Sequence, residues 1–263
     1  MLSDHGFEIA EAQIGELGPG DSVGIGLAAL LSGASRYVGL DIVPFSMRSD
    51  IEVVYEELVE LYSRRASIPD HNEFPGVRPR LASYKHPEHI VQWSGFEQRV
   101  DRIRTEIKSG LNTGGVVTYK VPWTSPADID SGSLDLVFSQ AVLEHVDSLK
   151  ETYEAMFCWL KPGGYGSHVV DFSAHHLSPH WNGHWAYSES EWRLVRGQRE
   201  FLLNRCPLSV HVRCAEQVGF DIIRLEKTYN ENGLPPVVLA QQFQTMNNED
   251  LRIQGAVMIL RKP

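Results

Sequence analysis

The sequence has few cysteines and no long apolar run, and both absences limit what the protein can be. Three cysteines, Cys158, Cys206 and Cys214, occur in 263 residues, and no two of them form a CxxC pair. Because their number is odd, neither a disulfide framework nor a thiolate zinc site is expected. No apolar run reaches the roughly 18 residues of a membrane span, and the first residues lack the pattern of a signal peptide. We therefore expect a cytoplasmic protein without a membrane span.

Clusters of positive charge are also missing. The chain has 24 Lys and Arg against 34 Asp and Glu, a net charge of −10, and its basic residues form no run. Nucleic-acid binding relies on clustered cations that replace the counterions of the phosphate backbone. The expected partner is therefore a small-molecule or saccharide acceptor rather than a nucleic acid, and the sequence leaves homo-oligomerisation open.

What is present begins with a strand, a glycine-rich turn and a helix. Residues 12–17 are a short, partly apolar run that ends in Gly18-Pro19-Gly20, and apolar side chains then recur at helical spacing from Val23 to Leu31. Residues 37–42 indicate a second buried strand that carries Asp41 near its end. This is a βαβ unit of the usual size.

Strands alternate with helices over most of the remaining chain. The patterns predict further strands at 116–121, 134–139, 167–172, 220–225 and 256–260, and helices at 51–61, 96–107, 149–160 and 209–218. Lys161-Pro162-Gly163-Gly164 is interpreted as a helix stop. The expected fold class is α/β, a doubly wound sheet with helices on both faces.

Two long connections interrupt this alternation. Residues 44–110 are too long for a simple connection between the second and third strands, so we expect an insertion that forms part of a cap. Residues 173–207 are rich in His and Trp and show little periodicity, which indicates a second insertion on the acceptor side. The whole chain, residues 1–263, is predicted to be a single domain.

The turn and the strand-end aspartate carry the first functional signal. A glycine-rich turn between a strand and a helix lets a ligand approach free backbone N–H groups, and Asp41 is placed to accept both hydroxyls of an adenosine ribose. A nicotinamide dinucleotide uses the same ribose contact. The protein motif that binds the pyrophosphate of such a cofactor, however, has a third glycine at the position where this chain has Val23.

Four motifs in order resemble the class I S-adenosylmethionine-dependent methyltransferases. They are Glu16-Leu17-Gly18-Pro19-Gly20-Asp21-Ser22, Tyr37-Val38-Gly39-Leu40-Asp41, the stretch from Leu134 to Val146 that contains Ser139-Gln140 and Glu144-His145, and Leu160-Lys161-Pro162-Gly163-Gly164. The resemblance implies a Rossmann-like seven-stranded sheet with the last strand antiparallel, and S-adenosylmethionine as the cofactor across the carboxyl ends of the first two strands.

The resemblance also implies which residues bind the cofactor. Carried over by motif position, Glu16 and the Gly18-Pro19-Gly20 turn shape the methionine and ribose pocket, Asp41 holds the ribose, and Ser139 with Gln140 flanks the sulfonium. Two departures stand out. Only about a dozen residues precede the first strand, where the family often has a closing helix, and residues 122–124 lack the usual polar adenine contact. We expect Trp123 to stack on the adenine instead.

Histidines dominate the region expected to meet the methyl acceptor. His145 follows the fourth predicted strand, and five more histidines lie within 17 residues, His168, His175, His176, His180 and His184. A positioned histidine is the commonest general base near neutral pH. We rank His175 first and His145 second, with Asp171 as the orienting carboxylate. A metal site on the i,i+4 histidines is disfavoured, because Pro179 and Gly183 interrupt a helical face.

Several acceptors and two other functions stay open at this point. Aromatic residues interleave the histidines, and residues 171–205 and 209–220 weakly resemble methyltransferases associated with polysaccharide or sugar modification. O-methylation of a small-molecule or saccharide hydroxyl is the favoured function. A small aromatic or natural-product acceptor and a protein or lipid acceptor compete with it. Core packing is favoured for Trp159 and Trp192. The alternatives to a methyltransferase are a catalytically silent partner protein with this fold and a nicotinamide-dependent oxidoreductase.

Overall fold

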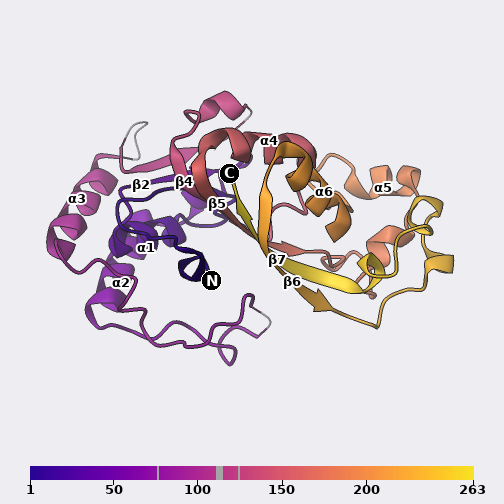
Figure 1. Cartoon of the computed structure of the whole chain (residues 1–263), viewed down its shortest axis with the longest axis horizontal. Helices are drawn as coiled ribbons and strands as arrows, with labels where there is room; N and C mark the ends of the chain where they lie inside the picture. The colour runs from indigo at the N-terminus through magenta and orange to yellow at the C-terminus, as the bar shows by residue number, and fades with distance from the viewer. Residues whose placement is uncertain (76, 111–114, 124) are drawn as a thin grey trace. The chain divides into compact units, whose positions relative to one another are not determined.

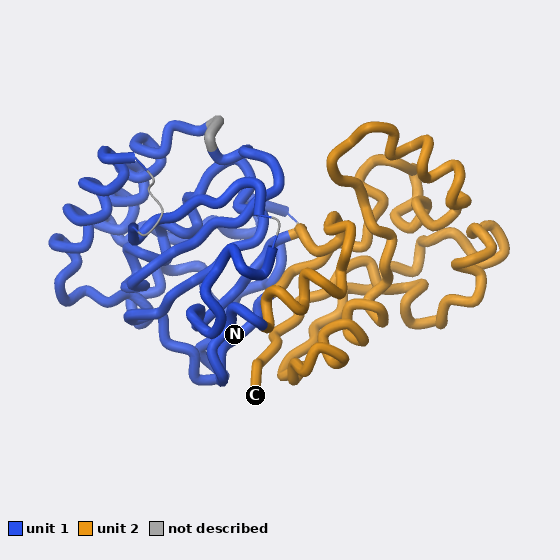
Figure 2. The backbone as a smooth tube through the Cα atoms, turned by 90° about the horizontal axis from the view of Figure 1, so that it is seen from above, with its two compact units in different colours: residues 1–140, 158–167 blue, residues 141–157, 168–263 orange. Residues whose placement is uncertain are grey.

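The chain folds into two compact units, which Figure 2 distinguishes by colour. A computed structural model describes residues 1–75, 77–110, 115–123 and 125–263, so Gly76 of the expected insertion and Thr124 beside Trp123 lie outside the described residues. Unit 1 comprises Met1–Gln140 and Cys158–Ser167, and unit 2 comprises Ala141–Phe157 and His168–Pro263. A single domain over residues 1–263 stays a prediction.

Seven strands follow one another in the order β3-β2-β1-β4-β5-β7-β6. Their bounds are β1 Gln13–Leu17, β2 Arg36–Leu40, β3 Val117–Lys120, β4 Leu134–Gln140, β5 Leu160–Asp171, β6 Asp221–Tyr229 and β7 Ile253–Arg261. β1 pairs in parallel with β2 and β4, β2 pairs in parallel with β3, and β7 runs antiparallel to β6. This order confirms the predicted seven-stranded α/β sheet with its antiparallel last strand.

The described helices are α1 to α6, and seven short 3₁₀ turns accompany them. The α-helices are α1 Gly24–Ser32, α2 Ile51–Ser63, α3 Phe96–Ser109, α4 Leu149–Trp159, α5 Glu189–Arg196 and α6 Leu208–Val218. The 3₁₀ turns are η1 Ser3–His5, η2 Phe45–Arg48, η3 Pro126–Asp128, η4 Gly183–Ala186, η5 Pro236–Val238, η6 Gln241–Phe243 and η7 Asp250–Arg252. In the part of the chain that the structure describes, none of these helices has both the length and the apolar character needed to cross a membrane.

In unit 1, helices α1, α2 and α3 pack against one another (Figure 1). The Asp50 side chain accepts hydrogen bonds from the N–H groups of Glu52 and Val53, which caps the first turn of α2. The apolar side chains of α3 recur at helical spacing and are all buried, namely Phe96, Val100, Ile103 and Ile107. The two helices predicted within residues 44–110 are thus confirmed, whereas the cap function of this segment stays a prediction.

In unit 2, helix α6 packs on the strand pair β6 and β7. The helix ends at Gly219, whose φ of 111° allows its N–H to bond the carbonyls of Ala215 and Glu216. Phe220 follows directly and is buried, so the chain enters β6 with its first apolar anchor in place. This helix and both closing strands confirm the predictions for residues 209–260.

Two local predictions were wrong. α4 ends at Trp159, so the predicted helix stop is confirmed, but residues 161–164 do not separate the helix from the strand, because β5 begins at Leu160 and already contains them. The region 173–207 is not wholly irregular, since it contains α5. The Ser188 hydroxyl accepts from the Glu191 N–H while the Glu191 carboxylate accepts from the Ser188 N–H, a capping box that starts this helix.

Candidate functional site

The glycine-rich turn after β1 leaves its backbone open to a ligand. Gly18 and Gly20 have φ of 62° and 71°, in the left-handed region that favours glycine. The Gly18 N–H donates to the Leu40 carbonyl at 2.8 Å, which fixes the turn to the end of β2. A Cβ atom added at Gly20 would meet no atom within 4 Å, so open space lies above this residue. The strand order also reverses between β1 and β4, where α/β sheets bind ligands.

Asp41 lies beside this turn, just after β2, and is 7% exposed. Its Oδ1 accepts from the N–H groups of Ile42 and Val43 at 2.8 and 3.3 Å. Its Oδ2 is buried and has no hydrogen-bond partner among the described residues. Burial raises the pKa of Asp41, and the two backbone N–H groups oppose that rise. A buried carboxylate oxygen without a partner fits a ligand hydroxyl.

Glu16 is the acidic residue of the first motif and is 2% exposed near the end of β1. The Tyr37 hydroxyl donates to its Oε2 at 2.6 Å. Burial raises the pKa of Glu16 to about 7, although the Tyr37 hydrogen bond lowers it and Asp41 adds a further rise. The motif position therefore carries a carboxyl group that is partly ionised near neutral pH.

The three other predicted cofactor residues of unit 1 lie at the neighbouring strand ends. The Trp123 N–H donates to the Asp41 carbonyl at 3.0 Å, and the Trp123 ring meets Trp159 edge to face. Ser139 is buried and pairs in register with Leu17, and Gln140 donates from Nε2 to the Arg78 carbonyl at 3.4 Å. The structure thus brings Glu16, the turn, Asp41, Trp123, Ser139 and Gln140 to the carboxyl ends of β1 to β4, within one unit.

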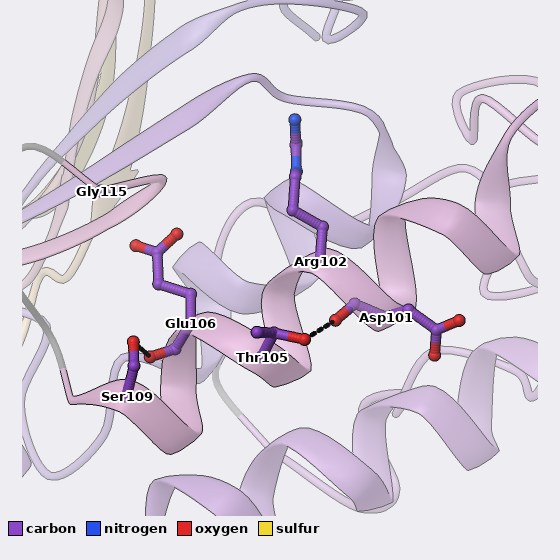
Figure 3. Close-up of a pocket in the computed structure, with 6 residues that line it drawn as sticks. All are labelled: Asp101, Arg102, Thr105, Glu106, Ser109 and Gly115. Carbon is purple, nitrogen blue, oxygen red and sulfur yellow. Dashed lines mark hydrogen bonds between the residues drawn. The ribbon is translucent and has the colours of Figure 1, made fainter.

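A hollow beside α3 does not belong to this site (Figure 3). Its lining residues are Asp101, Arg102, Thr105, Glu106, Ser109 and Gly115. The Thr105 hydroxyl donates to the Asp101 carbonyl and the Ser109 hydroxyl donates to the Glu106 carbonyl. Both hydroxyl groups therefore form hydrogen bonds with the backbone of α3 itself. The Glu106 carboxylate accepts from the Val117 N–H at the start of β3, the end of the strand opposite to Asp41. None of these residues was predicted to bind a ligand.

Unit 2 contains the predicted histidine and carboxylate pair. His175 Nε2 lies 3.2 Å from Asp171 Oδ2, and the Ser173 N–H donates to Asp171 Oδ1 at 2.8 Å. Contact with Asp171 raises the pKa of His175, against the effect of burial. Burial alone would raise the pKa of Asp171, but the His175 and Ser173 contacts outweigh it and lower that pKa. At a pH above the His175 pKa, the pair therefore consists of a neutral imidazole and an ionised Asp171 carboxylate.

Glu144 and His145 lie next to this pair. Glu144 Oε1 accepts from the Asp171 N–H at 3.3 Å and lies 3.9 Å from His175 Nε2. The rings of His145 and His175 meet edge to face, 5.0 Å between centroids. Burial raises the pKa of Glu144 to about 8 and lowers the pKa of His145 to about 4, and the nearby His175 lowers the latter further. His145 is therefore neutral at physiological pH.

The other histidines of this region fall into a buried pair and an exposed pair. His168 and His184 are buried, and burial lowers the pKa of each to about 3, while His176 and His180 are exposed. Within the described ranges, the histidines at i,i+4 spacing belong to no group of three ligand-type side chains close enough to hold a metal ion. Among the described residues, the set that brings three ligand-type atoms within 4.8 Å of one another is Glu144, His145 and His175, and these three residues could hold a metal ion.

The tryptophans of unit 2 belong to its core rather than to an open platform. Trp181 and Trp185 pack with Leu239, and Trp192 packs with Leu202 and Leu203. In unit 1, Trp159 is completely buried and donates from Nε1 to the Pro126 carbonyl. Core packing of Trp159 and Trp192 is thus confirmed.

Asn204 is a residue of this site that the sequence did not single out. Its N–H donates to the Glu144 carbonyl at 2.7 Å, and its Nδ2 donates to the carbonyls of Leu143 and Val146 at 2.8 and 3.1 Å. The Phe201 ring meets His145 edge to face. Because these contacts join segments about 60 residues apart, no local pattern points to them.

Comparison with known proteins finds one family model and several solved structures that resemble this chain. The sequence model of a family described as a methyltransferase domain matches residues 90–167. Similar solved structures include an S-adenosylmethionine-dependent methyltransferase from Mesorhizobium loti, which is 13% identical and has a TM-score of 0.49. The alignment covers 99% of this chain and 95% of that protein. A Methanosarcina mazei methyltransferase is 17% identical, with a TM-score of 0.47 and coverage of 99% and 96%. No curated protein matches the sequence.

A third solved structure is Haemonchus contortus phosphoethanolamine N-methyltransferase 2 in complex with S-adenosyl-L-methionine. It is 15% identical, with a TM-score of 0.49, and covers 100% of this chain and 51% of that protein. The family match and the observed strand order confirm the predicted resemblance to the class I S-adenosylmethionine-dependent methyltransferases. They support S-adenosylmethionine as the cofactor and methyl transfer as the activity.

Proposed function

We propose that this protein methylates a hydroxyl oxygen of a small-molecule or saccharide acceptor. Bound S-adenosylmethionine supplies the methyl group: the acceptor oxygen bonds to the methyl carbon while the carbon–sulfur bond breaks, and its electron pair stays on the sulfur of S-adenosylhomocysteine. Because the leaving group is good, positioning and exclusion of water provide most of the rate. The chain must also remove the hydroxyl proton.

The observation that carries the cofactor part of the proposal is the buried, unpartnered Oδ2 of Asp41 beside an open glycine turn. We assign the ribose hydroxyls to Asp41. The left-handed Gly18 and Gly20 let the cofactor approach the backbone, with Pro19 between them. Glu16 faces the methionine part, Trp123 the adenine, and Ser139 with Gln140 the sulfonium end. All of these residues belong to one unit, which supports a single cofactor pocket.

We assign proton removal to His175, with Asp171 as its positioning residue. The raised pKa of His175 makes the neutral imidazole a stronger base than a free histidine, and the carboxylate stabilises the imidazolium that forms. His145 is the second candidate. Its pKa of about 4 makes it a weaker base, although it stays neutral over the whole working range. His168 is fully buried, so an acceptor does not reach it.

The hydroxyl acceptor is favoured because this pair fits a nucleophile that must lose a proton. The saccharide assignment rests on the weaker resemblance of residues 171–205 and 209–220 to sugar-modifying methyltransferases. The buried tryptophans add no support to it, since Trp185 and Trp192 pack inside unit 2. A small hydroxylated molecule is therefore included on equal terms.

Titration calorimetry with S-adenosylhomocysteine tests the cofactor site. We expect Asp41→Ala to weaken binding by about 1.5–3 kcal/mol, because the ribose hydroxyls lose a charged acceptor. Asp130→Ala, which removes an exposed carboxylate from the loop before β4, is the matched control and should bind as the unchanged protein does. Equal affinities for Asp41→Ala and the unchanged protein would contradict the assignment. Mass spectrometry of hydroxylated small molecules and oligosaccharides incubated with S-adenosylmethionine then identifies the acceptor.

A further inference from the structure

Tyr37 and Glu16 form a buried hydrogen bond inside unit 1. The Tyr37 hydroxyl donates to Glu16 Oε2 at 2.6 Å, and the two residues are 0% and 2% exposed. Tyr37 lies on β2 and Glu16 on the adjacent β1, where Glu16 pairs in register with Gly39. The tyrosine side chain therefore runs along β2, past Gly39, to reach the carboxyl group.

Two glycines leave the space that this side chain occupies. A Cβ atom at Gly26, inside α1, would lie 2.3 Å from carbons of the Tyr37 ring. A Cβ atom at Gly39 would lie 2.9 Å from the Tyr37 hydroxyl. Glycine inside a helix or a strand lowers the stability of that element relative to alanine. Their presence at both positions indicates that the ring has a defined place and that its hydroxyl is aimed at Glu16.

We propose that Tyr37 is a positioning residue for cofactor binding, which holds the Glu16 carboxylate toward the cationic amino group of the cofactor's methionine part. This inference rests on the proposed role of Glu16 in the cofactor pocket. The hydrogen bond fixes one carboxylate oxygen and leaves the other for the ligand. The same hydrogen bond favours the ionised form of Glu16, which is the form that attracts a cationic amino group.

The hydrogen bond also affects the charge of Glu16. Burial raises the pKa of Glu16 to about 7, the Tyr37 bond lowers it, and Asp41 raises it. Burial and the neighbouring Glu16, Tyr119 and Asp41 raise the pKa of Tyr37 well above its usual range, so its hydroxyl stays a donor. Without this donor, the Glu16 pKa rises further and less carboxylate is present near neutral pH. Loss of Tyr37 should therefore weaken cofactor binding most at low pH.

The test compares Tyr37→Phe with Tyr55→Phe by titration of S-adenosylhomocysteine between about pH 6 and pH 9. Tyr55 is a matched control, because it is equally buried in unit 1 and its hydroxyl donates to the Val100 carbonyl between α2 and α3. We expect Tyr37→Phe to bind about tenfold more weakly at pH 6, the effect of a pKa rise of about one unit, and within about twofold of the unchanged protein at pH 9. Tyr55→Phe should follow the unchanged protein at every pH.

Equal affinity of Tyr37→Phe and the unchanged protein at all pH values would overturn the inference. A loss that does not vary with pH would overturn it too, since that is the signature of damaged packing. Should Tyr37→Phe fail to fold, Glu16→Gln provides the second readout, because its amide mimics the neutral carboxyl. Its affinity should be low, and the steep part of the pH dependence should be absent; persistence of that dependence would overturn the inference. An unchanged protein that binds no S-adenosylhomocysteine refutes the proposed function instead.

Discussion

Asp171 and His175 approach within 3.2 Å across a single turn that follows β5. His175 has a φ of 44°, in the left-handed region where a residue with a side chain is uncommon. Such conformations cost roughly 1–3 kcal/mol and cluster at functional sites. The Ser173 N–H holds the other Asp171 oxygen at 2.8 Å. The carboxylate is thus fixed on one side and pairs with the imidazole on the other, the arrangement that orients a general base.

The pair predicts the pH dependence of methyl transfer. The base must be neutral to accept a proton, so the rate should rise with pH through the His175 pKa, which Asp171 raises above 6.5. Asp171→Asn removes that effect, so the midpoint of the pH–rate profile should move to lower pH while the plateau falls. Initial rates between about pH 5 and 9, measured with the acceptor, give both quantities.

Two further variants support this measurement. His175→Ala should lower the rate by roughly 10²–10⁴-fold and leave S-adenosylhomocysteine affinity unchanged. Glu231→Gln is the control, since it removes an ion-paired carboxylate on the surface of the same unit, where Glu231 pairs with Arg252. Its profile should match that of the unchanged protein. An unshifted midpoint in Asp171→Asn would show that His175 does not set the profile.

Asn204 should position Glu144 and His145 without touching a ligand. Asn204→Asp keeps the shape and the oxygen that accepts from the Cys206 N–H, but it loses the two donors to Leu143 and Val146. Two carbonyl groups then lose their partner, so the free energy of unfolding should fall by about 1–3 kcal/mol in a urea titration. Methyl transfer should slow at saturating cofactor, whereas S-adenosylhomocysteine affinity should not change, because the predicted cofactor residues belong to the other unit.

Asn248→Asp serves as the control for Asn204, because Asn248 is exposed in the same unit. It should leave both unfolding and transfer unchanged. If Asn204→Asp behaves in the same way, the two side-chain hydrogen bonds from Asn204 to Leu143 and Val146 do not hold the site.

The residues proposed for cofactor binding follow from local sequence patterns, whereas part of the proposed acceptor site does not. Gly18, Gly20 and Asp41 lie within one βαβ unit, so local spacing alone brings them together. Asp171 and His175 were also within reach, since four positions separate them. The contacts of Asn204 with Glu144 cross about 60 residues and depend on tertiary packing, which no periodicity reports.

Local sequence patterns also gave wrong predictions for two secondary-structure elements, β5 and α5. The glycines and proline of residues 161–164 indicated a break, but strand pairing overrides them and β5 starts at Leu160. Conversely, Ser188 and Glu191 have the spacing of a capping box and could have revealed α5, yet the surrounding histidines and tryptophans obscured its short apolar face. Turn residues are thus weak evidence against a strand that begins in a buried sheet.

Removal of metal ions should not affect methyl transfer. Glu144, His145 and His175 come close enough to hold an ion, but His175 Nε2 already pairs with Asp171 in the arrangement of a base. We therefore expect equal rates before and after dialysis against a chelator, and no stimulation by added zinc or manganese. Loss of activity that one of these ions restores would assign the cluster to metal binding and displace His175 as the base.

The coil between α2 and α3 should become protected when the cofactor site is filled. Its Arg78 carbonyl accepts from Gln140 at the end of β4, beside the predicted sulfonium contact, while the side chains of Phe74 and Val77 are exposed. If this segment covers the bound cofactor, S-adenosylhomocysteine should slow tryptic cleavage after Arg80 and Lys85 several-fold. The exposed Arg193 and Arg199 of unit 2 provide an internal control in the same digest.

The Asp41→Ala variant shows whether slower cleavage comes from S-adenosylhomocysteine bound in the site or from a general effect of this compound on the digest. At ligand concentrations that saturate only the unchanged protein, the variant should be cut after Arg80 and Lys85 at its ligand-free rate. Equal cleavage of the unchanged protein with and without ligand, under conditions where calorimetry shows the site to be filled, would mean that residues 44–110 do not close over the cofactor. Protection at Arg193 and Arg199 to the same degree would instead indicate stabilisation of the whole chain, because a local cover acts only on the bonds it shields.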